Sequence, residues 1–268
     1  MNILTFKTLL LVVFAFTTVQ LSAQDQPPAL PDGWPANVRQ DLQQLTTKSA
    51  DPFAILLKRS ERIKVRGTAI LVPEAGKLAI SPDNMMFLRS SLAELGWDTI
   101  VITPPTWPEG ALTAPASEDT NELATAWELY QSQLQMTLEA TLEYAAQFPG
   151  SKMIVAEGTS AASLVSLYVN GKLEAPEALV VLSPYLPDPA LNFELSSWFG
   201  TSEYPLMDIY TPFDNRWAKA TIKPRATAAR KRLREDYRQS TMNIVPPNQG
   251  SQLWLTRQIH GWIDHLGW

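Results

Sequence analysis

Residues 65–73, VRGTAILVP, form the segment that decides the fold. The segment is short and apolar on both faces, which is typical of a strand buried inside a sheet. Similar segments recur at residues 97–103 (WDTIVIT), 152–156 (KMIVA), 178–183 (ALVVLS), 205–211 (PLMDIYT) and 241–245 (TMNIV). These segments predict the central strands of one sheet.

Segments with helical spacing separate these strands. They cover residues 82–95, 121–148, 160–169, 215–237 (with a break at Pro224) and 253–266. Doubly buried strands that alternate with helices predict an α/β fold, in which a mostly parallel sheet has helices on both faces. We expect little or no cap domain. Ligands of such sheets bind at the carboxyl ends of the strands, so the loops that follow them are the places for a site.

The N-terminal residues have the layout of a secretory signal peptide. An apolar run over residues 9–19 precedes the small residue Ala23. The run is too short for a membrane span, which needs about 20 apolar residues. We therefore expect a signal peptide over residues 1–23, a Pro-rich linker over 24–35 and a single domain over 36–268. The expected location is periplasmic or secreted, and no integral membrane protein is expected.

The composition excludes several classes of site. The chain has 268 residues, with 22 Lys and Arg against 27 Asp and Glu, so nothing global favours nucleic acid as a partner. It has no Cys and two His, which excludes disulfides and thiolate metal sites and argues against a histidine-rich metal site. We expect no metal and no cofactor.

At the start of the domain, residues 36–49 have helical spacing, and residues 53–58 are apolar but too short to assign.

Two groups of short motifs resemble the DUF3530 family of the α/β-hydrolase superfamily. The first group is GTAILVPEAG at residues 67–76 and LGWDT at 95–99, and the second is YRQ at 237–239 and HGWI at 260–263. The resemblance covers roughly residues 36–268. It implies the α/β-hydrolase fold and an exported protein of Gram-negative bacteria, and it implies no established activity.

The nucleophile of an α/β hydrolase stands on a sharp strand-to-helix turn, the elbow, usually within G-x-S-x-G. Residues 156–162, AEGTSAA, fit this pattern in two frames. In one frame Ser160 is the nucleophile. In the other, Gly158 occupies the elbow and the turn has no serine. We favour the second frame, because the apolar run ends before Glu157 and glycine most easily adopts the positive φ of such a turn. The resemblance also implies a glycine here.

The acid of a catalytic triad is matched by Asp214, which follows the strand at residues 205–211. The alternative is that Asp214 caps the following helix, and both interpretations stay open. Asp208 lies inside the strand and is expected to be paired structurally. Residues 74–76 follow the first core strand, where relatives place the amides of an oxyanion hole.

The base of the triad is missing from its expected place. A histidine should follow the last strand, but residues 246–251 read PPNQGS. His260 lies about ten residues further along a helix, roughly 15 Å away at the rise of an α-helix. A base must lie within hydrogen-bond reach of its nucleophile. His260 and His265 are therefore expected to be surface or packing residues.

A basic segment and several tryptophans suggest two kinds of ligand. Residues 216–238 are rich in Arg and Lys, and they form either a solvated helix face or an anion site for phosphate groups in the cell envelope. The candidate anion-binding residues are Arg225, Arg230, Arg232 and Arg234. Trp107, Trp198 and Trp217 either cover the core or line a pocket for an apolar ligand.

Two hypotheses follow for the function. The first is a non-catalytic protein of the hydrolase fold that binds a small apolar or anionic envelope ligand, or an envelope partner, which is otherwise unknown. The alternative is a weak or atypical serine esterase that uses Ser160 and Asp214. The missing histidine and the glycine at the elbow favour the first hypothesis.

Overall fold

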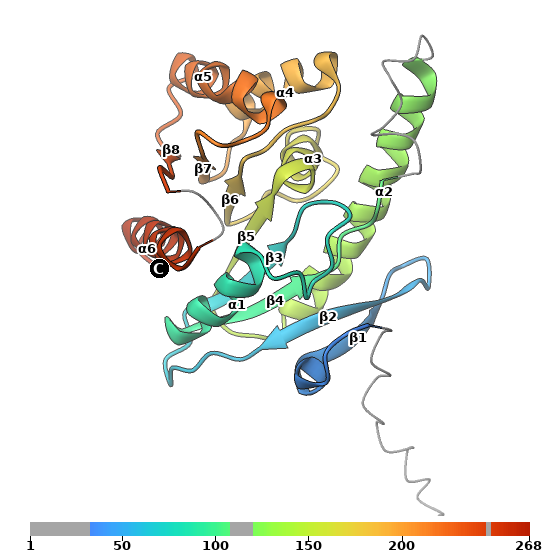
Figure 1. The fold of residues 1–268 in the computed structure, drawn as a ribbon, viewed down its shortest axis with the longest axis vertical. Helices are drawn as coiled ribbons and strands as arrows, with labels where there is room; N and C mark the ends of the chain where they lie inside the picture. Colours follow the sequence, from blue (N-terminus) through green and yellow to red (C-terminus); the bar gives the residue numbers. More distant parts are fainter. Residues whose placement is uncertain (1–32, 108–119, 245–247) are drawn as a thin grey trace, which may run out of the picture.

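The computed structural model describes residues 33–107, 120–244 and 248–268 (Figure 1). The expected signal peptide and most of the expected linker lie outside the described residues, as does most of the loop after the second core strand. Within the described ranges, no helix is long and apolar enough to cross a membrane.

The described strands form one mixed sheet of eight strands. Its order is β1-β2-β4-β3-β5-β6-β7-β8, and β2 is antiparallel to both neighbours while the pairs from β4 to β8 are parallel. The mostly parallel sheet predicted from the sequence is confirmed. The strands are β1 (Leu42–Thr46), β2 (Pro52–Lys58), β3 (Gly67–Val72), β4 (Trp97–Ile102), β5 (Ser151–Glu157), β6 (Ala178–Leu182), β7 (Leu206–Tyr210) and β8 (Tyr237–Thr241).

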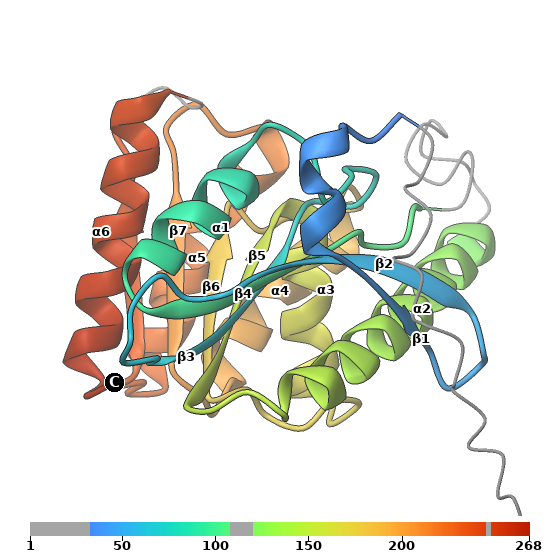
Figure 2. The same cartoon turned by 90° about the horizontal axis from the view of Figure 1, so that it is seen from below.

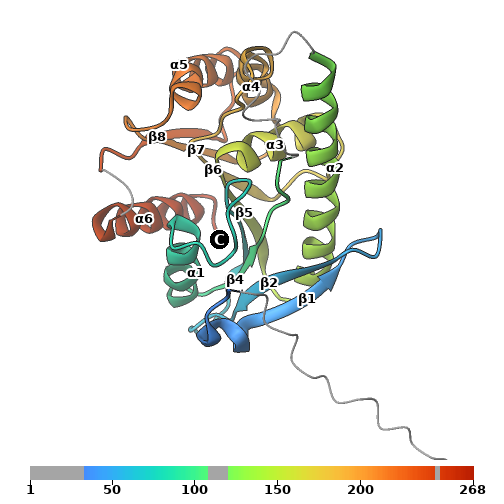
Figure 3. The ribbon, with the colours of Figure 1, turned by 45° about the vertical axis from the view of Figure 1, so that its right-hand side comes forward.

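Helices cover both faces of the sheet and define two cores (Figures 2 and 3). Side chains of α2, α3 and α4 pack on one face, and those of α1 and α6 pack on the other. α5 packs mainly against α4. The helices are α1 (Asn84–Glu94), α2 (Thr120–Ala145), α3 (Gly158–Val169), α4 (Pro189–Thr201), α5 (Arg216–Lys231) and α6 (Gln249–His265). In the described ranges these helices pack on the sheet or on each other, and none builds a separate cap.

The edges of the sheet differ from the sequence prediction. Residues 36–49 do not form one helix: a 3-10 turn, Ala36–Asp41, leads into β1, which pairs with β2. The spacing of Val38, Leu42 and Leu45 fits a helix, but pairing with β2 satisfies the backbone as well and buries Leu42. β8 lies earlier than the apolar segment 241–245, because the polar residues Tyr237–Thr241 pair with β7. A half-exposed edge strand lacks the apolar signature of a central one.

Two helices also differ from the prediction. α5 continues through Pro224 without the expected break. α4 lies between β6 and β7, where no helix was expected. Its N-cap is Asp188, whose side chain accepts a hydrogen bond from the Leu191 amide.

The order of the strands reverses at β3. β3 has β4 on one side and β5 on the other, and α1 and α2 lie on opposite faces of the sheet. At such a switch point the loops diverge from the strand ends and leave a crevice for ligands. The residues that follow β3 and β5 therefore define the candidate site.

Candidate functional site

Gly158 occupies the sharp turn between β5 and α3. Its φ is 58°, in the left-handed region that glycine adopts at little cost. A Cβ atom built on Gly158 would lie 2.5 Å from Oε1 and 2.7 Å from Cδ of Glu74. The carboxylate of Glu74, the second residue after β3, therefore fills the space into which a side chain at the elbow would project.

Ser160 lies two residues into α3, and its hydroxyl contacts α2. Its side chain is fully buried, and its hydroxyl is 3.0 Å from the hydroxyl of Tyr130 on α2. Burial raises the pKa of Tyr130 well above its ordinary value, so this hydroxyl stays protonated. Ser160 is not among the residues that line the cavity above the elbow, whereas Asp214 is. The structure thus does not bring these two candidate residues together.

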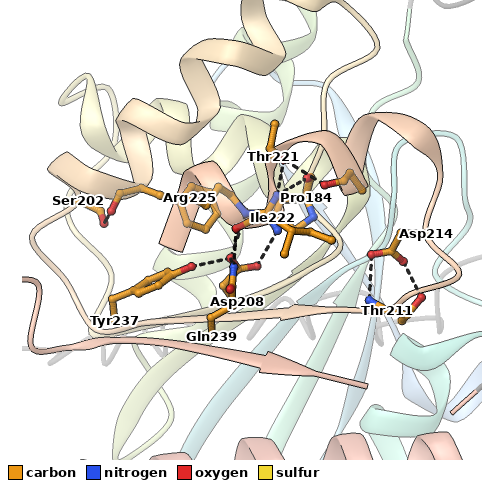
Figure 4. Close-up of polar contacts among 12 residues, drawn as sticks. Pro184, Ser202, Asp208, Thr211, Asp214, Thr221, Ile222, Arg225, Tyr237 and Gln239 are labelled. Carbon is orange, nitrogen blue, oxygen red and sulfur yellow. Dashed lines mark hydrogen bonds and ion pairs between the residues drawn. The ribbon is translucent and has the colours of Figure 1, made fainter. Parts of the chain in front are cut away.

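Asp214 lies in the loop after β7 and is held by neutral donors. Its carboxylate accepts hydrogen bonds from the amide and hydroxyl of Thr211, at 3.0 and 2.9 Å, and from the hydroxyl of Ser183, at 2.8 Å (Figure 4). Asp214 is not the cap of α5. That role belongs to Asn215, whose side chain accepts from the amides of the first turn of the helix.

An acidic cavity of about 180 Å³ lies at the carboxyl ends of β3, β5, β6 and β7. Most of its polar side chains are not among the residues predicted from the sequence. The Oε1 atom of Glu74 accepts a hydrogen bond from Tyr185, at 2.6 Å, and Glu157 Oε1 accepts one from Asn84, at 3.3 Å. Both glutamates directly follow strands that the sequence does predict, and that position is the signal that could have found them. The residues around the cavity include Glu74, Asn84, Glu157, Ser183, Tyr185 and Asp214.

Lys77 is shared by three carboxylates beside this cavity. Its ammonium lies 3.0 Å from Glu157 and 3.7 Å from each of Glu74 and Asp83. Burial raises the pKa of Glu157 and outweighs the opposite effect of Lys77. Burial also raises the pKa of Tyr185, and its hydrogen bond to Glu74 adds to this shift. Tyr185 therefore remains a donor toward Glu74 at neutral pH.

Both histidines of the chain lie in the last part of α6. His260 lies 3.7 Å from Asp264, which pairs with Arg66 at 2.6 Å, just before β3 begins. Glu74 and the elbow lie beyond the other end of β3. Since β3 has six residues, its length separates these places by roughly 20 Å.

The four candidate anion-binding arginines lie on α5 or just after it, and they differ in exposure. Arg225 is fully buried and makes a two-pronged ion pair with Asp208, at 2.9 and 3.1 Å (Figure 4). It is therefore closed to a ligand from solvent, which corrects the prediction for this residue. Arg234 donates to the carbonyl of Tyr204, at 2.9 Å, and Arg230 and Arg232 are exposed.

The three tryptophans suggested as pocket residues do not line the acidic cavity. Trp107 stacks on Tyr130 with a centroid distance of 4.8 Å and belongs to the core. Trp198 packs against the same core, and Trp217 lies under the guanidinium of Arg216.

Solved structures with this sheet are α/β hydrolases, and the chain has their fold. An esterase from Pyrococcus furiosus is 10% identical, with a TM-score of 0.60, and the match covers 89% of this chain and 96% of that one. A dienelactone hydrolase from Anabaena variabilis is 13% identical, with a TM-score of 0.59 and coverage of 84% and 98%. The esterase domain of a Rhodothermus marinus protein is 11% identical, with a TM-score of 0.58 and coverage of 82% and 96%.

Residues 32–265 match the family described as "Protein of unknown function (DUF3530)". The chain therefore belongs to the DUF3530 family. No curated protein matches it.

Proposed function

We propose that this protein is a periplasmic or secreted member of the α/β-hydrolase fold that does not catalyse hydrolysis and instead binds a ligand or an envelope partner at its acidic cavity. The observation that carries the proposal is the elbow. Gly158 supplies no nucleophile, and the Glu74 carboxylate fills the space that a nucleophile would need.

The positions of the other candidate residues support the same proposal. The hydroxyl of Ser160 is hydrogen-bonded to Tyr130 in the core. His260 lies near the start of β3, at the end of the sheet opposite to the elbow. A serine nucleophile without a base within reach loses on the order of 10⁴ or more in rate. The alternative, an esterase that uses Ser160 and Asp214, would require both side chains to leave their present hydrogen bonds.

An ester panel tests the absence of catalysis. Purified residues 24–268 are incubated with p-nitrophenyl acetate, butyrate and octanoate beside an active bacterial esterase. We expect no release of nitrophenol above the rate in buffer, for the wild type and for Ser160→Ala alike. Turnover in the wild type that Ser160→Ala or Glu74→Gln abolishes would overturn the proposal.

The location is tested separately. The full chain and residues 24–268, each fused at the C-terminus to alkaline phosphatase, are expressed in a Gram-negative host. We expect phosphatase activity only with the full chain, because this enzyme needs the oxidising periplasm for its disulfides. Equal activity of the two fusions would contradict an export signal in residues 1–23.

A further inference from the structure

The acidic cavity has an excess of negative charge. Glu74 and Glu157 line it and share the single ammonium of Lys77 with Asp83, which lies outside the lining. Asp214 also lines the cavity and is held by the hydroxyls of Thr211 and Ser183 and by one amide, all of them neutral. Burying charges without full compensation is costly, so a bound cation would lower the free energy of this arrangement.

A buried acceptor at the same cavity has no donor. Asn84 begins α1, and its side chain is 9% exposed. Its amide nitrogen donates to Glu157, whereas its Oδ1 atom accepts no hydrogen bond from any residue that the structure describes. An unsatisfied buried acceptor costs free energy and calls for a partner. The Oδ1 atom needs a hydrogen-bond donor, and the excess of negative charge favours a donor that is positively charged.

The other wall of the cavity is apolar. Leu182 at the end of β6, Ile209 near the end of β7 and Met242 after β8 line it. The volume of about 180 Å³ is close to that of a cavity that holds benzene, about 150 Å³. A ligand that fits has a charged donor at one end and a short apolar body.

From the charge, the free acceptor and the apolar wall, we infer that the acidic cavity binds a small primary amine, with its ammonium group among Glu74, Asn84 and Glu157 and its alkyl body against Leu182, Ile209 and Met242. An ammonium brings three donors and one positive charge. One donor can meet the Oδ1 atom of Asn84, and the charge offsets part of the negative charge of the carboxylates. Within the described residues, no three acidic or histidine side chains are placed to hold a metal ion, which favours an organic cation. The inference rests on the proposed ligand-binding function and names its ligand class.

Calorimetric titration with three probes of one size tests the inference. The probes are n-butylamine, butan-1-ol and butyrate, in phosphate buffer because amine buffers would compete. We expect saturable binding of butylamine with one site per chain. Butanol should bind at least about 10-fold more weakly, since it lacks the charge-assisted hydrogen bonds, and butyrate more weakly still. Equal binding of amine and alcohol, or tighter binding of butyrate, would overturn the inference.

Variants locate the binding. Glu74→Gln and Glu157→Gln each remove one carboxylate from the ammonium site with little change of shape, and each should weaken butylamine by about 10-fold. Glu128→Gln removes a charge from the exposed face of α2 and should leave the affinity unchanged. Circular dichroism melts identify a variant that fails to fold, and the other variant then decides. Affinity that is unchanged in a folded cavity variant would overturn the site.

The result is separable from the test of catalysis. If butylamine does not bind and the ester panel is negative, the amine inference is wrong while a non-catalytic protein remains. If the panel is positive and Ser160→Ala abolishes turnover, the proposed function is wrong whatever binds. A titration with calcium chloride completes the experiment. If calcium binds with measurable heat and the cavity variants abolish that heat, the ligand of the cavity is a metal ion and the amine inference is wrong.

Discussion

Two acidic networks lie at the carboxyl half of the sheet, and they differ in how far they are satisfied. Asp208 on β7 is fully buried and accepts two hydrogen bonds from Arg225, one from Tyr237 at 2.7 Å and one from Gln239 at 2.9 Å. Every charge in this network has its partner. At the acidic cavity, by contrast, three carboxylates share Lys77, and the buried amide oxygen of Asn84 accepts no hydrogen bond from the described part of the chain.

The difference separates a structural network from the proposed binding site. In the closed network around Asp208 the hydrogen-bonding groups are paired with one another, and they fix α5 on β7 and β8. The network beside the acidic cavity contains a buried acceptor without a donor among the described residues, which a ligand could satisfy. We therefore interpret the α5 network as stabilising the fold and the acidic cavity as the proposed ligand site.

The largest effect is expected from breaking the closed network. Arg225→Met leaves Asp208 buried without its cation, which costs about 3–5 kcal/mol in the free energy of unfolding. Urea denaturation measures it. The matched control is Arg230→Met, on the exposed face of the same helix, which should change stability by less than about 0.5 kcal/mol. A loss below about 1 kcal/mol in Arg225→Met would show that the network is not closed as described.

A second prediction concerns the elbow. Gly158→Ala places a Cβ at positive φ, at a cost of about 1–2 kcal/mol, and pushes Glu74 away from Tyr185, which adds about 1 kcal/mol. Gly171→Ala is the control, because its φ is 65° and nothing lies within 4 Å of the added atom. It should lose only the first of these amounts.

Removal of the Glu74 side chain tests the origin of the excess loss. In a Glu74→Ala background, the two alanine substitutions should cost the same by urea denaturation. A difference that persists without Glu74 would mean that this carboxylate does not fill the elbow.

The sequence predicted the layers of the fold because central strands carry their own signal. The segments at residues 65–73, 97–103 and 152–156 are apolar on both faces and appear as β3, β4 and β5. The edges carry no such signal. β8 is polar and β1 has helical spacing, so their place depends on pairing with a neighbour that local pattern does not reveal.

The candidate site was only half visible for a related reason. Gly158 was singled out because a turn restricts its own residue, which is a local effect. Glu74 and Glu157 lie far apart in sequence and meet only because β3 and β5 are neighbours. Arg225 shows the opposite error: a run of basic residues on a helix resembles a surface patch, but one position faces Asp208.

A smaller effect on stability is expected from glycine substitutions at two residues with positive φ, Leu233 after α5 and Ser183 at the acidic cavity. Leu233 has a φ of 53° directly after α5 and is largely exposed, so Leu233→Gly should stabilise the protein by about 0.5–1 kcal/mol. Ser183 has a φ of 48°, but its hydroxyl binds Asp214. Ser183→Gly relieves similar strain and loses a hydrogen bond worth about 1 kcal/mol, so thermal melts should show no gain. A gain equal to that of Leu233→Gly would mean that the bond to Asp214 contributes nothing.

The smallest effect is a change in the pH dependence of stability. Burial raises the pKa of Glu157 despite Lys77, so the folded protein holds this proton more tightly than the unfolded chain does. The stability that protonated Glu157 contributes is complete below the ordinary glutamate value of 4.5 and is lost as the pH rises through the folded pKa. Glu157→Gln cannot ionise. The free energy of unfolding of the wild type, relative to this variant, should therefore fall as the pH rises above 4.5.

Urea titrations of the wild type and of Glu157→Gln at a series of pH values from 4 to about 7 measure this difference. The sign decides between two descriptions of the cavity. If the difference in the free energy of unfolding falls as the pH rises, burial has a larger effect on the pKa of Glu157 than Lys77 has. Lys77 then does not compensate the negative charge of the cavity. A difference that rises with pH would mean that Lys77 already compensates Glu157, and the acidic cavity would then resemble the closed network around Asp208.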